Sequence, residues 1–179
     1  MSLPSFNFEY IIYVICSVLC FIPALVVHEV SHGFVAYKLG DPTAKVAGRL
    51  SLNPAKHLDW FGTIALPLFL MLCKMPVIGY AKPVPYNPSY FKDPRKGDLI
   101  VGLAGPLSNF AMALIASGIC WLIYLFVPAT IQNNQAFAMF YVFFLQQFVM
   151  INLFLMFFNL LPIPPLDGSS IIAVLIPVR

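Results

Sequence analysis

The sequence predicts an all-α polytopic membrane protein, a helical bundle with short extended or β segments associated with the membrane. Only 9% of the 179 residues are charged, whereas 60% are hydrophobic and the mean hydropathy is +0.87. Soluble domains carry about 25% charged residues, so this chain cannot cover its surface with charge. We expect residues 1–179 to form one domain, because a chain of this length leaves no room for a second.

Three apolar stretches, at residues 8–39, 99–127 and 136–161, are expected to span the bilayer. Each is long enough, at 1.5 Å per helical residue, to cross a hydrocarbon core of about 30 Å. The first contains Pro23 and is followed by a glycine and then a proline, which is typical of a helix end.

Two further apolar segments are too short to span. The segment at about residues 60–80 is interrupted by Pro67, Lys74 and Pro76, so we expect a re-entrant or interfacial element there. The alternative is an ordinary span with one basic loop outside. Residues 169–179 are expected to be a truncated final segment.

The basic residues gather in two loops, at residues 38–56 and 82–96, whereas the loop at 128–135 has none. The positive-inside rule therefore places both basic loops in the cytoplasm, and the first and last spans then run in the same direction. The alternation in residues 49–52 permits a short strand. Residues 82–85 must be extended, because proline disfavours helix at its own position and at the one before.

The most informative motif is His-Glu-Val-Ser-His at positions 28–32, inside the first span. His28 and His32 are four residues apart, so both imidazoles project from one face of a helix and can share one metal ion. Glu29 is placed to act as a general base towards water at that metal. The whole chain has only three histidines, so this spacing does not come from a background rich in ligands.

A catalytic zinc site needs a third protein ligand and an open position. The candidates in this chain are His57, Asp41, Asp59, Asp93, Asp98 and Asp167. Asp167 stands apart, because it is the only acid after Asp98 and follows the last span on a proline-rich segment that can fold back. Its alternative role is a cap for a helix starting at Gly168. His57 and Asp59 are candidates for a further metal contact or a regulatory lid, or for a cap of the following helix.

These residues resemble the site-2 proteases, which are intramembrane zinc metallopeptidases. The family pattern has His-Glu-x-x-His in a membrane helix and a later Asn-x-x-Pro-x-x-x-x-Asp-Gly segment, matched here at 28–32 and 159–168. Residues 104–109 are similar to the Gly-Pro motif that opens a helix in the family. Residues 49–54 and 81–85 look like motifs of its compact prokaryotic members, which lack appended domains.

The resemblance implies one zinc ion per chain, held by His28, His32 and Asp167. It implies that Glu29 is the general base and that Asn159 is a catalytic polar residue near the substrate oxygen. The substrates would be single-span membrane proteins, cut within or near their transmembrane segments, in regulated proteolysis or signal-peptide clearance. The implied location is a prokaryotic inner membrane, with the active site towards the cytoplasm.

Helical backbone hides its carbonyl groups, so a substrate must unwind before it is cut. We expect the extended chain at Lys82, Pro83, Val84 and Pro85, or at residues 49–53, to pair with the unwound peptide by strand addition.

One alternative function is a divalent-metal transporter that uses the His and Asp cluster as a transit site, but no internal repeat or continuous polar path is visible. Another alternative is a catalytically silent relative that serves as a binding scaffold, but the presence of the candidate base Glu29 argues against it. The net charge of only +3 gives no support for nucleic-acid binding.

Overall fold

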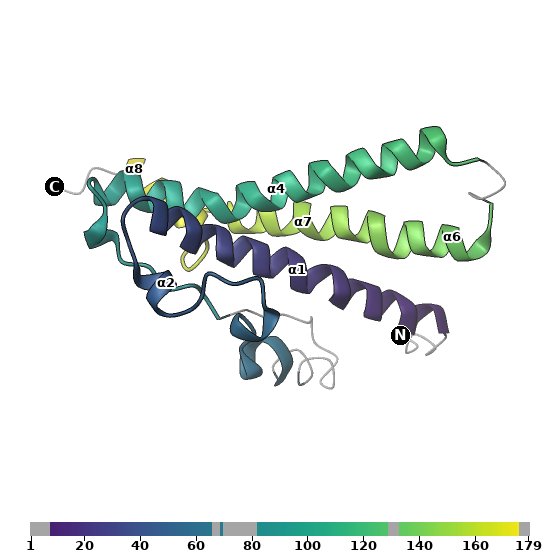
Figure 1. Ribbon diagram of the computed structural model, residues 1–179, viewed down its shortest axis with the longest axis horizontal. Helices are drawn as coiled ribbons and strands as arrows, with labels where there is room; N and C mark the ends of the chain where they lie inside the picture. The colour runs from purple at the N-terminus through teal and green to yellow at the C-terminus, as the bar shows by residue number, and fades with distance from the viewer. Residues whose placement is uncertain (1–7, 66–68, 70–81, 129–132, 176–179) are drawn as a thin grey trace.

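The computed structural model describes residues 8–65, 69, 82–128 and 133–175. Long helices lie side by side along one axis (Figure 1). They are α1 (Phe8–Lys38), α4 (Pro94–Phe126), and a helix built from α6 (Gln135–Phe140), the π-helical segment η4 (Tyr141–Gln146) and α7 (Gln147–Asn159). The first and last of these run in the same direction and α4 runs against them, so the all-α class and the relative directions of these helices are as predicted.

Helix α1 matches the first predicted span to within one residue. Pro23 lies inside the helix without ending it. Gly40 follows the helix with a φ of 107°, in the left-handed region that favours glycine, and this turn stops the helix.

Helix α4 begins five residues earlier than the predicted start at residue 99. The reason is a cap: the side chain of Asp93 accepts a hydrogen bond of 3.1 Å from the Lys96 N–H, and Pro94 occupies the first turn, where no backbone donor is needed. Hydropathy alone missed this start, because the capping residues are polar.

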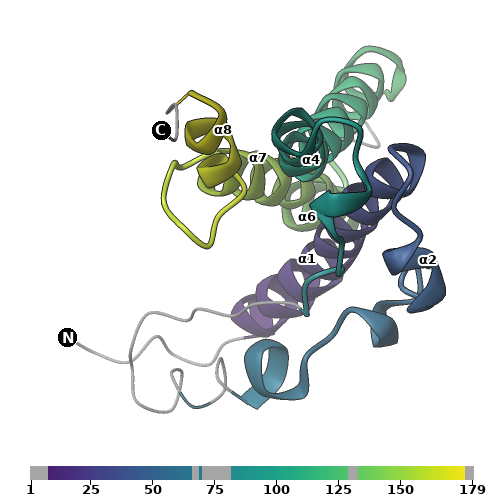
Figure 2. The same ribbon diagram turned by 90° about the vertical axis from the view of Figure 1, so that its left-hand side faces the viewer.

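The last long helix starts at Gln135 and ends at Asn159, two residues before the predicted end. Pro162 follows closely and cannot donate to the helical ladder. The chain after Asn159 turns back and enters the short helix α8 (Gly168–Leu175), which packs beside α4 (Figure 2).

The remaining described elements are short. They are α2 (Thr43–Val46), the 3-10 turns η1 (Pro54–Lys56) and η3 (Pro88–Tyr90), and the π-helical segment η2 (Trp60–Ala65). Most of the predicted re-entrant element at 60–80 lies outside the described residues.

The expectation of short β segments is wrong for the described part of the chain, which contains no strand. Residues 82–85 are free of helix, as predicted, and so are the next two residues, but the segment does not pair in a ladder. Their prolines lack an N–H to donate, and a side chain takes the carbonyl groups instead: Arg49 Nη2 donates to the Lys82 oxygen at 2.5 Å and to the Pro83 oxygen at 3.2 Å.

Two helices of the described chain are long and apolar enough to cross a membrane, Ile15–Lys38 within α1 and Pro94–Phe126. The chain that leaves α1 and the chain that enters α4 carry most of the basic residues and meet these helices at one end of the bundle, whereas the facing ends of α4 and α6 lie at the other (Figure 1). This common end agrees with the charge pattern of the sequence.

Asp41 ties the end of α1 to the chain that leads into α4. It is fully buried and accepts hydrogen bonds from the Asn87 N–H at 2.6 Å and from the N–H and hydroxyl of Thr43. Burial raises the pKa of Asp41, but the bonds from Thr43 and Asn87 outweigh it and hold the pKa below its ordinary value.

Asp41→Asn should therefore destabilise the fold by about 1–3 kcal/mol at neutral pH, because an amide replaces a charged acceptor of several donors. A lowered folded-state pKa stabilises the fold fully above the ordinary aspartate pKa of about 3.9, and this contribution disappears as the pH falls through the lowered value. The difference in the free energy of unfolding between the variant and wild type should therefore become smaller below about pH 4. Thermal unfolding in micelles at several pH values measures it, and equal melting temperatures at pH 7 would contradict the assignment.

Candidate metal centre

The two histidines of α1 lie one helical turn apart, facing α4, and both are buried: His28 is 4% exposed and His32 is 7% exposed. Their Nε2 atoms are 3.1 Å apart. The helix ends at Lys38, so the two residues lie about 15 and 9 Å from that end at 1.5 Å per residue.

Hydrogen bonds at the other ring nitrogen determine the tautomer of each histidine. His32 Nδ1 lies 2.7 Å from the Val101 carbonyl oxygen, which can only accept, so His32 must donate there. His28 Nδ1 lies 2.6 Å from the Asn109 Oδ1 atom. The Nδ2 group of Asn109 donates to the Ala24 oxygen and to Asn152 Oδ1, so the Oδ1 atom of Asn109 is an acceptor and His28 donates. In the neutral imidazoles, both Nε2 atoms then carry lone pairs.

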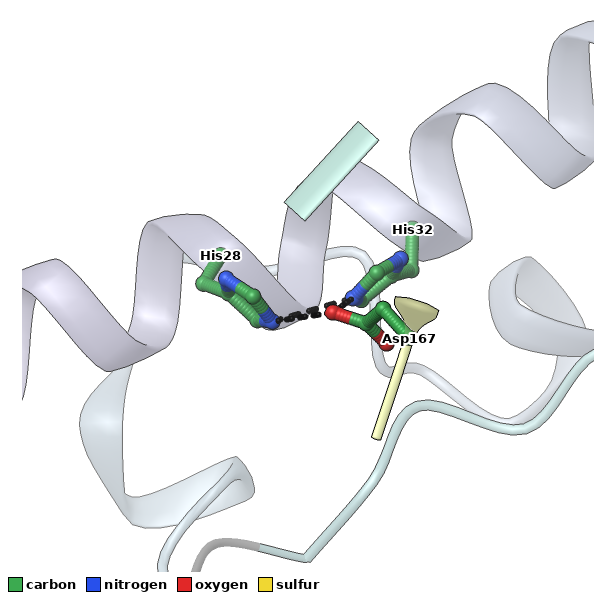
Figure 3. A group of neighbouring side chains, drawn as sticks. All are labelled: His28, His32 and Asp167. Atoms are coloured by element: carbon green, nitrogen blue, oxygen red, sulfur yellow. Dashed lines mark hydrogen bonds and ion pairs between the residues drawn. The ribbon is translucent and has the colours of Figure 1, made fainter. Parts of the chain in front are cut away.

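Asp167 reaches these lone pairs from the turn between α7 and α8 (Figure 3). Its Oδ2 atom lies 3.1 Å from His28 Nε2 and 3.4 Å from His32 Nε2. This buried oxygen has no hydrogen-bond partner of its own. Asp167 directly precedes α8, the position of a helix cap, but this carboxylate oxygen faces the imidazoles.

The turn that returns Asp167 to the bundle depends on the next residue. A Cβ atom at Gly168 would lie within 2.5 Å of the Leu160 and Leu161 backbone, so only glycine permits this contact. The start of α8 therefore packs directly on the end of α7, and the carboxylate before it points inward.

A zinc ion fits these three donors. Three lone-pair atoms at such distances repel one another unless a cation or protons lie between them. Tetrahedral zinc with ligands at about 2.0–2.1 Å separates them by about 3.3 Å. The observed separations are 3.1, 3.1 and 3.4 Å. Neutral imidazole nitrogen and carboxylate oxygen are also ligands that zinc accepts.

Helix α4 is shaped to admit the two imidazoles at Gly105. A Cβ atom at this position would lie 2.6 Å from His28 Nε2 and closer still to His32 Nε2. Gly105 therefore allows α4 to approach the metal ligands directly, as small residues do between packed helices.

Glu29 and Asn159 both line the cavity beside the three donors, which has a volume of about 270 Å³. Glu29 Oε2 accepts the Val84 N–H at 2.9 Å. Asn159 is the last residue of α7 and its Nδ2 group donates to the Leu155 oxygen at 2.9 Å. The structure thus brings both predicted catalytic residues to the cavity.

Of the four predicted substrate-binding residues, two line this cavity. Pro83 and Val84 line the cavity, and Val84 is buried, whereas Lys82, Pro83 and Pro85 are exposed. The Lys82 N–H donates to the His57 carbonyl oxygen at 2.9 Å, which joins this segment to the loop after α2.

The other candidates for a third ligand have different partners. Asp41, Asp59, Asp93 and Asp98 accept hydrogen bonds from Asn87, Gly62, Lys96 and the Tyr86 hydroxyl respectively, and His57 Nε2 donates to the Ser51 oxygen at 2.7 Å. Asp59 caps the start of η2, which is the structural alternative foreseen for it.

The centre also contains two residues to which the sequence pattern assigns no role, Asn109 and Asn152. Asn109 orients His28, and Asn152 on α7 orients Asn109. In the sequence, both are polar amides within apolar stretches. A buried amide needs hydrogen-bond partners, but the sequence pattern does not identify them. Both prove to be completely buried.

Residues 122–179 match the family described as Peptidase family M50. A Bacillus subtilis protein named "Putative zinc metalloprotease YwhC" is 42% identical over 160 residues, which cover 89% of this chain and 68% of that protein. The chain belongs to peptidase family M50. The predicted site-2 protease family and its zinc metalloprotease class are therefore confirmed.

Two mycobacterial proteins of the same description, both called Rip2, are also similar to this M50 peptidase. The one from Mycolicibacterium smegmatis is 29% identical over 145 residues, and one from Mycobacterium tuberculosis is 31% identical over 148 residues. The chain spans about half the length of these two relatives. No solved structure matches it. Nothing in the comparisons supports the transporter alternative.

Gly105→Ala should sharply weaken zinc binding, by about 10- to 100-fold or more, because the new Cβ displaces both imidazoles. Gly118→Ala on the same helix is the matched control, since a Cβ there meets nothing within 4 Å. Zinc content after dialysis against a graded series of competing chelator concentrations measures the effect. Equal zinc retention in the two variants would contradict this account of Gly105.

Asn109→Leu should lower zinc affinity by about 10- to 100-fold, because His28 loses the acceptor that selects its tautomer. Asn109→Asp keeps an oxygen acceptor at this position and should retain zinc better than the leucine variant. The same competition assay compares them. If both variants bound zinc as wild type does, Asn109 would have no part in orienting His28.

Proposed function

We propose that this M50 peptidase is an intramembrane zinc endopeptidase that hydrolyses peptide bonds within or near the transmembrane segments of other membrane proteins. The observation that carries the proposal is the convergence of His28, His32 and Asp167 between helices that are long and apolar enough for a membrane. We assign one zinc ion per chain to these three ligands.

Bound zinc would polarise the scissile carbonyl group and activate a water molecule. Glu29 lies beside the first ligand and lines the same cavity. Its carboxylate would take the proton of the attacking water and pass it to the leaving amine. The Asn159 amide has two N–H donors, of which Leu155 accepts one, so a second donor is left for the substrate carbonyl oxygen.

The proposed function includes a location in the membrane. We place residues 1–179 as a single multi-pass domain in a prokaryotic inner membrane, with the metal centre towards the cytoplasm. The grouping of the basic loops at one end of the bundle supports this orientation. The distances of about 9 and 15 Å from the α1 end to the histidines make a water path from that side short.

The substrates we propose are single-span membrane proteins that present an unwound segment. We propose that an extended peptide reaches the metal centre along the segment of Lys82, Pro83, Val84 and Pro85, of which Pro83 and Val84 line the cavity. Helical peptide could not react there, because its carbonyl groups are engaged in hydrogen bonds.

Glu29→Gln should reduce cleavage of a single-span reporter by about 10²- to 10⁴-fold and leave zinc content unchanged, because the amide has the size of the carboxylate but cannot accept the proton. A zinc chelator should abolish the wild-type activity, and added zinc should restore it. Gly118→Ala serves as the active control. Cleavage that survives both the glutamine variant and the chelator would refute the proposal, as would zinc transport into vesicles by a protein that cuts nothing.

A further inference from the structure

The proposed general base, Glu29, is held by the same extended segment that is proposed to bind the substrate. Glu29 Oε2 accepts a hydrogen bond of 2.9 Å from the backbone N–H of Val84. Val84 is only 4% exposed. It lies in the extended chain of residues 82–87, which crosses α1 on its way to α4 (Figure 2).

The Val84 side chain docks on the same face of α1 as its backbone. Gly33 lies one helical turn after Glu29, and a Cβ atom there would be 2.6 Å from Val84 Cγ1 and 2.9 Å from Leu50 Cδ2. The absence of a side chain at Gly33 therefore creates the place where Val84 sits. Backbone and side chain together determine where the Val84 N–H points.

Arg49 holds the chain just before Val84. Its Nη2 atom donates to the carbonyl oxygens of Lys82 and Pro83, and Arg49 is only 8% exposed. No ion pair in the described part of the chain includes Arg49. Burying a guanidinium group without a carboxylate costs free energy, so its position is not explained by charge pairing. At the other end of the segment, the Asn87 N–H is held by Asp41.

We propose that the Val84 N–H and Arg49 are positioning groups for the general base. The Val84 N–H holds one oxygen of the Glu29 carboxylate, and Arg49 holds the chain that carries this N–H. This inference rests on the proposed function, in which Glu29 accepts a proton.

The physical reason is the freedom of a glutamate side chain. Glu29 has three rotatable side-chain bonds and its head is only partly buried, so without a partner its carboxylate would sample several positions. A hydrogen bond to a charged acceptor restricts Oε2 and leaves the other oxygen for the reacting water. Pro83 and Pro85 have no N–H, so Val84 supplies the only backbone donor at these three positions.

This role differs measurably from substrate pairing by the same segment. If the Val84 N–H served mainly to bind substrate, removing it would raise KM. If it positions Glu29, removing it lowers kcat while KM and zinc content remain as in wild type.

The test is Val84→Pro in the full chain, assayed on the single-span reporter with zinc content measured in parallel. Proline removes the N–H and suits a segment that two neighbouring prolines already keep extended. We expect kcat to fall about 10- to 100-fold, because one hydrogen bond to a charged group is lost. Val84→Ala keeps the N–H and trims the side chain, so the kcat of the proline variant should lie about tenfold or more below that of the alanine variant.

Two further variants test the same inference in case the proline variant does not fold correctly. Replacing Val84 by the corresponding α-hydroxy acid turns the amide into an ester, which removes the N–H and keeps the isopropyl group. Arg49→Met removes the donor to Lys82 and Pro83. Both should lower kcat with unchanged KM and zinc content, the ester as strongly as Val84→Pro.

A wild-type kcat in the ester variant would overturn the inference. So would a raised KM at unchanged kcat, or an increased kcat, which would mean that the contact restrains the carboxylate. Glu29→Gln separates this failure from failure of the proposed function: if the glutamine variant is inactive while the ester variant is fully active, only the positioning role is wrong. If the glutamine variant cleaves, the role of Glu29 itself is wrong.

Discussion

The metal centre depends on hydrogen bonds at the side of each imidazole that faces away from it. The Nε2 lone pairs of His28 and His32 can point towards one metal ion because the Nδ1–H groups donate hydrogen bonds elsewhere. Asn109 Oδ1 accepts the one from His28, and the Val101 carbonyl oxygen accepts the one from His32. Both acceptors belong to α4, which can approach closely because residue 105 is glycine. The interface between α1 and α4 therefore selects the tautomers, and with them the ability of Asp167 to complete a cation site.

The same hydrogen bonds also hold the bundle together. An amide buried between apolar helices costs free energy unless its donors and acceptors are paired. Asn109 on α4 meets this requirement through α1 and through Asn152 on α7, so one buried network joins three helices at the depth of the metal ligands. Loss of register between the helices would leave amides unpaired and would separate the ligands, so packing and ligand geometry are coupled.

The open side of the centre is made by segments that are far apart in the chain. Glu29 comes from α1, Asn159 from the end of α7, and Pro83 and Val84 from the chain before α4. Glu29 and Asn159 are positioned by helices, whereas Pro83 and Val84 belong to an extended segment that prolines keep free of helix. The protein thus combines a rigid set of metal ligands with a wall of irregular backbone, which helices alone would not provide.

The sequence by itself determined the family, the helical class and the residues from which a metal site could be built. Those signals are local: a four-residue spacing within one helix, an Asp-Gly pair after a proline-rich turn, and apolar stretches of spanning length. Only the tertiary structure decided the partners of Asn109, the function of Gly105 and the contact of Arg49 with the chain before α4, and it replaced the expected β pairing by side-chain hydrogen bonds. These contacts depend on how helices rotate and approach one another. His28 and Asn109, for example, are 81 residues apart in the chain, and no local periodicity records such a distance.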